Sequence, residues 1–277
     1  MVSVVKADGV SEPFNRMKVF KTCLKLCGSI ELAEKVSKRV EEQVYDGIST
    51  REILSIIFKI MAEYKPAIAY RVDLRTSLSL LRSKPDFENF ISQIFRNLGY
   101  EVERNVIVQG FCIEHEVDVL VSKGDKLIYV EVKHHMNPHK YVDLEAVEKV
   151  WATLLDIREG YEKGLNKLNI SKPLVATNTK FTKHAYKYAK CRGIDLLGWG
   201  AADAMDLEKL IVEFKLYPIT ILKGFELNTL YKVIDMGYVT VKQLADSTAS
   251  ELLKAGLSEE DANLLVERAR EVFEILP

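Results

Sequence analysis

The 277-residue chain lacks the features that mark membrane, secreted or disulfide-rich proteins. No apolar run approaches the roughly 18 residues expected of a membrane-spanning helix. The first ten residues, MVSVVKADGV, lack the basic start and long apolar stretch of a signal peptide. The four cysteines form no CxxC pair, which argues against a zinc ribbon or a disulfide framework. We therefore expect a reduced, cytoplasmic protein that does not associate with a membrane.

The chain also lacks an overall charge of one sign, because 39 basic and 40 acidic residues leave a net charge of −1. Any affinity for nucleic acid must then come from local patches. Residues 1–83 carry a net charge of +4, residues 84–216 carry −1 and residues 217–277 carry −4. The cuts fall close to Pro85 and Pro218, and the residue before a proline is a common helix boundary. We predict three domains with these bounds.

The central region predicts a multidomain α/β protein built around a mixed sheet. A helix over residues 87–100 ends at Gly99, and a helix from 144 to 160 follows three strands. The expected strands cover residues 101–108, 115–122, 127–135, 173–178 and 194–200, with further helices over 180–191 and near 206–215. This αβββαβαβα order indicates a sheet with helices on both faces.

Three polar residues stand out on the second and third of these strands. Asp118 lies on one strand, and Glu131 and Lys133 lie two residues apart on the next, so their side chains point the same way. Two carboxylates on neighbouring strands repel each other unless a cation joins them, and hard oxygen ligands suit Mg²⁺ or Mn²⁺. The carbonyl group of Val132 is a possible further ligand. Lys133 would then orient or help deprotonate a water beside a phosphate. A weak ion pair on a solvated strand face is the alternative.

The segment 84–216 resembles the PD-(D/E)xK nuclease superfamily, in particular Mrr-type restriction endonucleases and archaeal junction-resolvase-like proteins. The matching stretches are FENFISQIFRNLGYEV, HEVDVLV, VEVKHH, GIDLLGW and the basic residues within KFTKHAYKYAK. The resemblance implies that Asp118, Glu131 and Lys133 are catalytic and that Asp118 and Glu131 bind the metal. It also implies that Glu88, on the first helix, joins the site. Val117 stands where the family pattern has a proline.

Several other residues near this motif leave alternatives open. His134, His135 and His139 suggest zinc, but adjacent histidines on a strand face opposite ways, so a phosphate or supporting contact is favoured. Glu116 shares the strand face of Asp118, or simply lies at a solvated strand start. Four lysines of the helix expected near residues 180–192 form one stripe, which is either a solvated face or a contact for DNA phosphates: Lys180, Lys183, Lys187 and Lys190.

The N-terminal region predicts a short hairpin followed by four helices, with Thr50 as the N-cap of the third. Four cations are candidates to converge on an anion near the start of that helix, unless they are scattered over the surface: Lys6, Lys18, Arg71 and Arg75.

Residues 4–78 resemble an ATP-cone, a nucleotide-binding regulatory domain. The matches are VxKxDGxxExFNxxK from Val4 to Lys18, YDGIxT from Tyr45 to Thr50, and YRxxxR over residues 70–75. The resemblance implies ATP or dATP as a regulatory ligand, with a basic residue of the last helix, Arg71 or Arg75, on the phosphates. The residues it implies for the nucleotide are Lys6, Glu12, Asn15, Lys18 and Thr50. Leu54 replaces a histidine found in some members, and the lack of a GxxxxGK[ST] loop argues against an ATPase motor.

The last region, residues 217–277, predicts a small all-α domain. Gly237 and Gly256 interrupt it, and Thr240 and Ser258 are expected N-caps. It resembles a tandem helix-hairpin-helix domain, which implies that backbone amides around Gly256 bind DNA phosphates. The net charge of −4 favours, as an alternative, a packing or protein-contact module.

Together these patterns predict a Mg²⁺-dependent or Mn²⁺-dependent DNA endonuclease that is regulated by adenine nucleotide. A homodimer is expected, because two active sites are needed to cut two strands. The alternative is a catalytically inactive, nucleotide-controlled DNA-binding or assembly factor.

Overall fold

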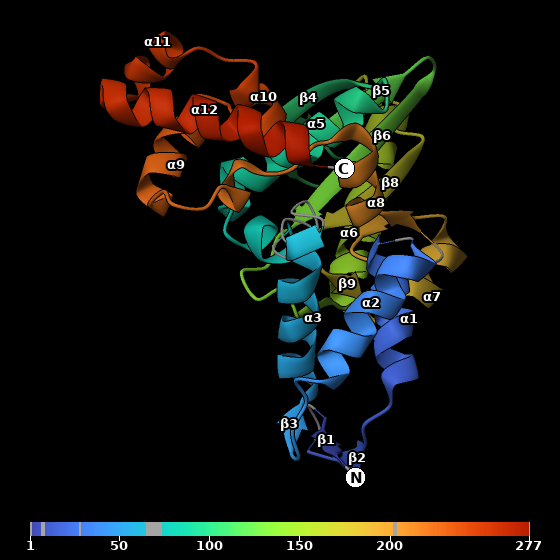
Figure 1. Cartoon of the computed structure of the whole chain (residues 1–277). Helices are drawn as coiled ribbons and strands as arrows, with labels where there is room; N and C mark the ends of the chain where they lie inside the picture. Colours follow the sequence, from blue (N-terminus) through green and yellow to red (C-terminus); the bar gives the residue numbers. More distant parts are fainter. Residues whose placement is uncertain (1, 7–8, 28, 65–73, 202–203, 277) are drawn as a thin grey trace. The chain divides into compact units, whose positions relative to one another are not determined.

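The computed structural model describes residues 2–6, 9–27, 29–64, 74–201 and 204–276 (Figure 1). The chain divides into two compact units, residues 1–73 and residues 74–275. None of the helices in the described ranges is long and apolar enough to cross a lipid bilayer.

The first unit combines a small sheet with helices. Its elements are β1 (Ser3–Val5), β2 (Ser11–Pro13), α1 (Arg16–Cys27), α2 (Ile30–Glu41), β3 (Ile48–Ser49) and α3 (Thr50–Tyr64). The strands lie in the order β2-β1-β3, with β1 antiparallel to β2 and parallel to β3. The helices enclose a core that includes Val36, Ile57 and Met61. The predicted fourth helix falls partly on residues 65–73, which lie outside the described residues, and residues 74–79 are helical in the second unit.

The start of α3 corrects one prediction. Ser49, not Thr50, caps this helix, because the Ser49 Oγ accepts a hydrogen bond from the Glu52 N–H at 3.1 Å. The Glu52 carboxylate in turn accepts from the Ser49 N–H at 3.1 Å. This reciprocal pair is a capping box, and Thr50 becomes the first residue inside the helix. The glutamate three residues after Ser49 was the signal for the correct position.

The second unit is built on a six-stranded sheet. Its elements up to residue 214 are η1 (Ser83–Phe87), α5 (Glu88–Asn97), β4 (Glu101–Gln109), β5 (Glu114–Lys123), β6 (Lys126–Lys133), β7 (Tyr141–Val142), α6 (Leu144–Glu162), β8 (Lys172–Thr177), β9 (Lys180–Phe181), α7 (Lys183–Arg192), β10 (Asp195–Gly198), β11 (Met205–Asp206) and α8 (Leu207–Phe214). The order is β11-β10-β8-β6-β5-β4. β6, β8, β10 and β11 run parallel, and β5 and β4 complete the sheet as an antiparallel hairpin. The predicted mixed sheet is confirmed.

Apolar residues on both sides of the strands bury the sheet. Tyr129 and Val175 pack with residues of α6 and α7 such as Leu154 and Ala185. Val130, the neighbour of Tyr129 in β6, has no exposed surface and points the other way. Helices α5 and α8 contact each other and the sheet. Burial of both faces explains why β5 and β6 are nearly continuous apolar runs.

The predicted helix over residues 180–191 begins later than expected. The Thr182 side chain accepts a hydrogen bond from the Ala185 N–H, so α7 starts at Lys183. Lys180 instead lies in β9, which pairs in parallel with β7. Lys180 is therefore not part of the helical stripe, whereas Lys183, Lys187 and Lys190 remain on exposed positions of α7.

The C-terminal segment is helical and belongs to the second compact unit. It consists of η2 (Ile219–Ile221), α9 (Leu227–Asp235), α10 (Val241–Ala245), α11 (Ala249–Leu252), η3 (Leu253–Ala255) and α12 (Glu259–Ile275), drawn in orange and red in Figure 1. Both predicted N-caps are confirmed, because Thr240 forms a capping box with Gln243 and the Ser258 Oγ accepts from the Asp261 N–H. The Tyr231 hydroxyl donates to the Leu80 carbonyl at 2.7 Å, which joins α9 to the segment before η1.

A partly buried aspartate of α6, Asp156, holds the loop between β4 and β5. The Asp156 carboxylate accepts from the Cys112 N–H at 2.8 Å and lies 2.7 Å from the His115 Nε2. Burial raises the pKa of Asp156, but the hydrogen bonds from Cys112 and His115 outweigh it and lower that pKa to about 2. The charged form of Asp156 therefore stabilises the folded state.

Replacing Asp156 by Asn is expected to lower the free energy of unfolding at pH 7 by about 2 kcal/mol. The stabilisation is fully present above the usual aspartate pKa near 4 and is lost as the pH falls through about 2. Wild type and variant should therefore converge in acid. Both tryptophans, Trp151 and Trp199, lie in the second unit, so their fluorescence during urea unfolding measures this effect. Glu159→Gln on an exposed position of the same helix is the matched control, and a loss of stability independent of pH would contradict the argument.

Candidate active site and nucleotide pocket

The candidate active site lies where the ladder between β5 and β6 ends. The last paired residues are Val119 and Val130, so Asp118 and Glu131 come next on their strands. On the other side of β5, the ladder with β4 skips the position of Asp118, opposite Asn105. Asn105 has a left-handed backbone with φ 53°, which asparagine tolerates better than most residues. The sheet is thus interrupted on both sides of Asp118.

A hydrogen bond across the strands fixes the Asp118 carboxylate. Its Oδ2 accepts from the backbone N–H of Val132 at 2.9 Å. Val132 lies between Glu131 and Lys133, so this bond ties the aspartate to the segment that carries the other two predicted catalytic residues. The structure therefore brings Asp118, Glu131 and Lys133 into one site, although Asp118 is 13 positions from Glu131 in the sequence.

The Glu131 carboxylate is held by two neighbours on its own strand. The Lys133 Nζ donates to its Oε1 at 2.6 Å, and the Tyr129 hydroxyl donates to its Oε2 at 2.5 Å. Tyr129 is buried, and burial raises its pKa strongly, with further contributions from the charges of Glu131 and Asp118.

Sequence reasoning missed Lys84, whose positive charge lies among three carboxylates of the site. The Lys84 Nζ lies 2.9 Å from Asp118 Oδ1, 3.1 Å from Glu116 Oε1 and 3.3 Å from Glu88 Oε1. Glu88, at the start of α5, is 1% exposed, and apart from this ion pair with Lys84 its carboxylate oxygens have no hydrogen-bond partner among the described residues. Burial and the nearby charge of Asp118 raise the pKa of Glu88. Lys84 thus links Glu88 to Asp118, and a role of Glu88 in the metal site stays a prediction from the resemblance.

The donor set fits a hard divalent cation held by few side chains. Asp118 and Glu131 supply carboxylate oxygens, which Mg²⁺ and Mn²⁺ prefer, and the buried carboxyl group of Glu88 offers further oxygens of the same kind. Within the described residues, no three His, Cys, Asp or Glu side chains are arranged as a ready-made metal site. An ion at Asp118 and Glu131 would therefore complete its coordination with water and a backbone oxygen, which Mg²⁺ commonly does.

Of the histidines after β6, His134 is held by contacts away from the catalytic candidates. His134 Nε2 lies 2.9 Å from the Leu78 carbonyl oxygen, and its Nδ1 lies 3.3 Å from the Ser83 Oγ. Burial lowers the pKa of His134 and of His135. His139 is exposed. The structure forms no zinc site from these residues within the part of the chain that it describes.

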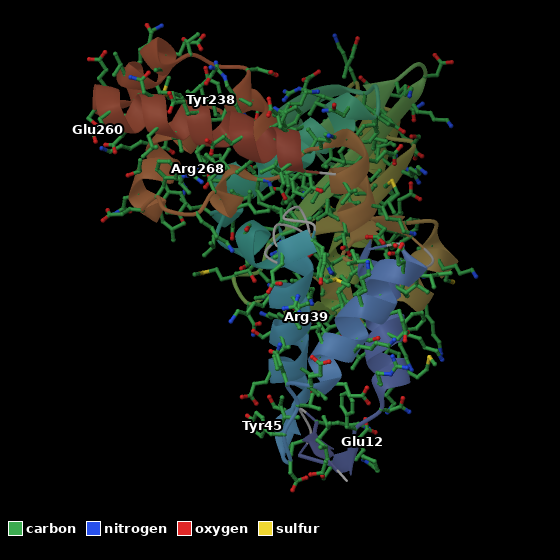
Figure 2. All side chains as sticks on the ribbon, viewed as in Figure 1. Glu12, Arg39, Tyr45, Tyr238, Glu260 and Arg268 are labelled. Atoms are coloured by element: carbon green, nitrogen blue, oxygen red, sulfur yellow. The ribbon has the colours of Figure 1, made fainter. Side chains whose placement is uncertain are left out.

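The first unit contains a cavity of 160 Å³ lined by most of the residues predicted to bind nucleotide. These are Glu12, Asn15, Lys18 and Thr50, with Leu54 and apolar residues of α1 and α3 completing the lining. Glu12, labelled near the small sheet in Figure 2, pairs with Lys6 and with Lys18 at 2.7 Å each. The hydrogen bond from Lys18, followed by that from Lys6, lowers the pKa of Glu12. The Asn15 Oδ1 accepts from the Met17 N–H at the start of α1.

The two arginines predicted for phosphate binding differ in what the structure shows. Arg71 lies outside the described residues. Arg75 belongs to the second unit, where its guanidinium donates to the Pro138 carbonyl and lies 5.9 Å from the centre of the Trp199 ring. Arg75 is therefore engaged within the second unit.

The predicted phosphate-binding turn at Gly256 is closed by a local bond. The Gly256 N–H donates to the Leu253 carbonyl at 3.0 Å, with φ 72° at the glycine. The first turn of α12 carries Glu259, Glu260 and Asp261, and Figure 2 labels Glu260 at that end of the helix. This arrangement favours the alternative of a packing module.

Comparison with known proteins divides the chain into three matched regions. Residues 82–211 match the family model described as restriction endonuclease, of the Mrr catalytic type. Residues 2–76 match the ATP cone domain. Residues 217–273 match the model described as AF1548-like, C-terminal. The resemblances to an Mrr-type endonuclease and to an ATP-cone are confirmed.

A curated relative and a solved structure are each similar to about two thirds of the chain. An uncharacterized protein of Archaeoglobus fulgidus is 32% identical over 183 residues, which cover 66% of this chain and 99% of the relative. A solved structure, titled as that of the protein of unknown function AF1548, is 31% identical with a TM-score of 0.59. It covers 68% of this chain and 97% of its own.

Proposed function

The chain belongs to the AF1548-like family with an Mrr-type restriction endonuclease domain and carries an ATP cone domain, and from this premise we propose that it is a nucleotide-regulated, metal-dependent DNA endonuclease. In this proposal residues 1–83 sense adenine nucleotide, residues 84–216 cut DNA and residues 217–277 are an accessory helical part. The observation that carries it is the hydrogen bond from the Val132 N–H to Asp118, because it joins all three catalytic candidates.

In this proposal each side chain of the site has a separate role in phosphodiester hydrolysis. Asp118 and Glu131 would hold Mg²⁺ or Mn²⁺, which when bound lowers the pKa of a water and offsets charge on the phosphate. Lys133 places its ammonium beside Glu131, where it can orient the attacking water and the phosphate oxygen. Tyr129 fixes the Glu131 carboxylate, and Glu88 places a further carboxyl group beside Lys84, the partner of Asp118.

The experiment that tests this function is cleavage of linear, branched and base-modified DNA by the full-length protein. We expect cleavage with Mg²⁺ or Mn²⁺ and none with excess EDTA. DNA that is bound but stays intact under all metal conditions would favour the nucleotide-controlled DNA-binding or assembly factor instead.

Binding of DNA would rely on local cations, since the whole chain is almost neutral. Lys183, Lys187 and Lys190 share one exposed stripe of α7, and Lys180 lies in β9 just before it. Phosphate contacts need no particular base, so such a stripe suits binding of the DNA backbone. A homodimer would supply the second active site for the second strand, and sedimentation that shows only monomer, with and without ATP, would exclude it.

Adenine nucleotide is proposed to bind the cavity of the first unit. Its 160 Å³ is less than the roughly 300 Å³ typical of pockets for complete small ligands, so it suits one part of a nucleotide, such as the base. Lys6 and Lys18, which now share Glu12, would then be available at its rim for the phosphates.

Replacing Lys18 by Met is expected to weaken binding of ATP and dATP by about tenfold, the effect of losing about 1.4 kcal/mol from one charge-assisted hydrogen bond. Isothermal titration calorimetry of the full chain measures the change. Lys35→Met removes a similarly exposed lysine of α2 that pairs with Glu31, and it should leave the affinity unchanged. If both variants weaken nucleotide binding equally, then the loss comes from the lower positive charge of the unit as a whole and not from a contact at this cavity.

A further inference from the structure

Lys84 lies at a position that the catalytic motif does not explain. It belongs to η1, four residues before Glu88, and its ammonium contacts three carboxylates at 2.9–3.3 Å. Two of these carboxylates, Glu88 and Asp118, are only 1% and 5% exposed. An ordinary surface ion pair joins two exposed side chains and contributes little. Here one cation serves a largely buried acidic cluster.

The backbone that carries Lys84 is held firmly in place. Asp86 is fully buried, and its carboxylate accepts from the Arg82 backbone N–H at 3.0 Å and from the Arg82 Nε at 2.7 Å. Phe87 is also fully buried. The start of the lysine side chain is thus fixed, and only its end is free to adjust to the carboxylates.

The two carboxylate oxygens of Asp118 accept hydrogen bonds from two different segments of the chain. Oδ2 accepts from the Val132 N–H, on the segment of Glu131 and Lys133. Oδ1 accepts from Lys84, which also lies beside Glu88. The aspartate therefore joins the segment of Glu131 and Lys133 to the ammonium of Lys84, and the buried Glu88 carboxylate, whose Oε1 lies 3.3 Å from that ammonium, borders the position that Lys84 occupies.

We propose that the Lys84 ammonium is a built-in second cation of this site, occupying the position where a second divalent ion would bind between Asp118 and Glu88. The inference rests on the proposed metal-dependent function and deepens it, because it assigns one divalent ion, at Asp118 and Glu131, to each chain. Two-metal nucleases place their ions about 4 Å apart around a shared carboxylate, and Lys84 supplies one of these two charges permanently.

Removal of the ammonium should open the second position to metal. We would titrate Mn²⁺ into the full-length protein by calorimetry, and we expect one ion per chain for the wild type. Lys84→Met keeps the length of the side chain without its charge, so a second ion is expected to bind. Lys84→Arg keeps a cation and should still bind one ion. The double variant Lys84→Met/Glu88→Gln should return to one ion, because it lacks the carboxylate that marks the second position.

Thermal melting of each variant confirms that it is folded; Lys84 is 54% exposed, so its replacement leaves no buried gap. One ion of unchanged affinity in Lys84→Met, or two ions in the wild type, would overturn the inference while leaving metal-dependent cleavage intact. A wild type that binds no Mn²⁺ would overturn both the inference and the proposed function. The two failures are therefore distinguishable.

Discussion

Replacing Asp118 by Asn is expected to lower the rate of DNA cleavage by at least about 10³-fold, because a neutral amide cannot hold and neutralise a divalent ion. The substitution keeps the shape of the side chain. Its carbonyl oxygen can still accept the hydrogen bond from the Val132 N–H, so the link between β5 and β6 should survive. The loss should therefore appear in cleavage and in Mn²⁺ binding, with DNA binding preserved.

Lys133→Met should reduce cleavage by about 10²–10³-fold through a different route, since it removes a group that positions the water and leaves the carboxylates in place. We expect this variant to keep its affinity for Mn²⁺. Single-turnover cleavage, Mn²⁺ titration and DNA binding, measured on both variants, separate the two roles. Asp125→Asn and Lys126→Met are matched controls, because they make the same chemical changes at exposed positions of the same hairpin.

Several results would contradict this division. Full activity in both variants would mean that another site, or a contaminant, cuts the DNA. Loss of Mn²⁺ binding in Lys133→Met would mean that the lysine supports the metal position and not only the water. Loss of activity in the two controls would indicate that the hairpin itself, and not its catalytic end, is sensitive to substitution.

The main parts of the site were predictable because they follow strand periodicity. Glu131 and Lys133 are two residues apart on an apolar strand, and Asp118 is at the matching distance for a hairpin. Sequence reasoning missed Tyr129, although it belongs to the same alternation, two residues before Glu131, and that position was the signal that could have identified it. Lys84 could not be found in this way. It is 34 positions from Asp118, and only the fold brings the two side chains together.

The exact ends of helices depended on single hydrogen bonds, which the spacing of residue types in the sequence does not reveal. The spacing of lysines suggested one helix from residue 180, but the Thr182 side chain starts the helix after itself. The association of the C-terminal helices with the segment before η1 was also not predictable. It depends on isolated polar groups, such as the Thr220 hydroxyl, which donates to the Ser77 carbonyl at 2.7 Å. Such contacts have no periodicity in the sequence.

Tyr129→Phe is the sharpest test of how the site is organised beyond its motif. The substitution deletes only the hydroxyl that donates to Glu131. Glu131 is 8% exposed, so its Oε2 would lose this donor in a largely buried position. We expect a loss of about 1–3 kcal/mol in the free energy of unfolding. Cleavage should fall by about 10–10²-fold through a lower kcat, because Glu131 is no longer held in one orientation.

Addition of Mn²⁺ distinguishes a positioning role from simple packing. A bound ion would replace the missing partner of Glu131, so Mn²⁺ should restore stability more in Tyr129→Phe than in the wild type, as measured by urea unfolding with tryptophan fluorescence. Tyr161→Phe, at an exposed position of α6, should change neither quantity. If Tyr129→Phe is destabilised equally with and without Mn²⁺ and retains its kcat, then the hydroxyl serves only the packing of the sheet, and Glu131 is oriented by Lys133 alone.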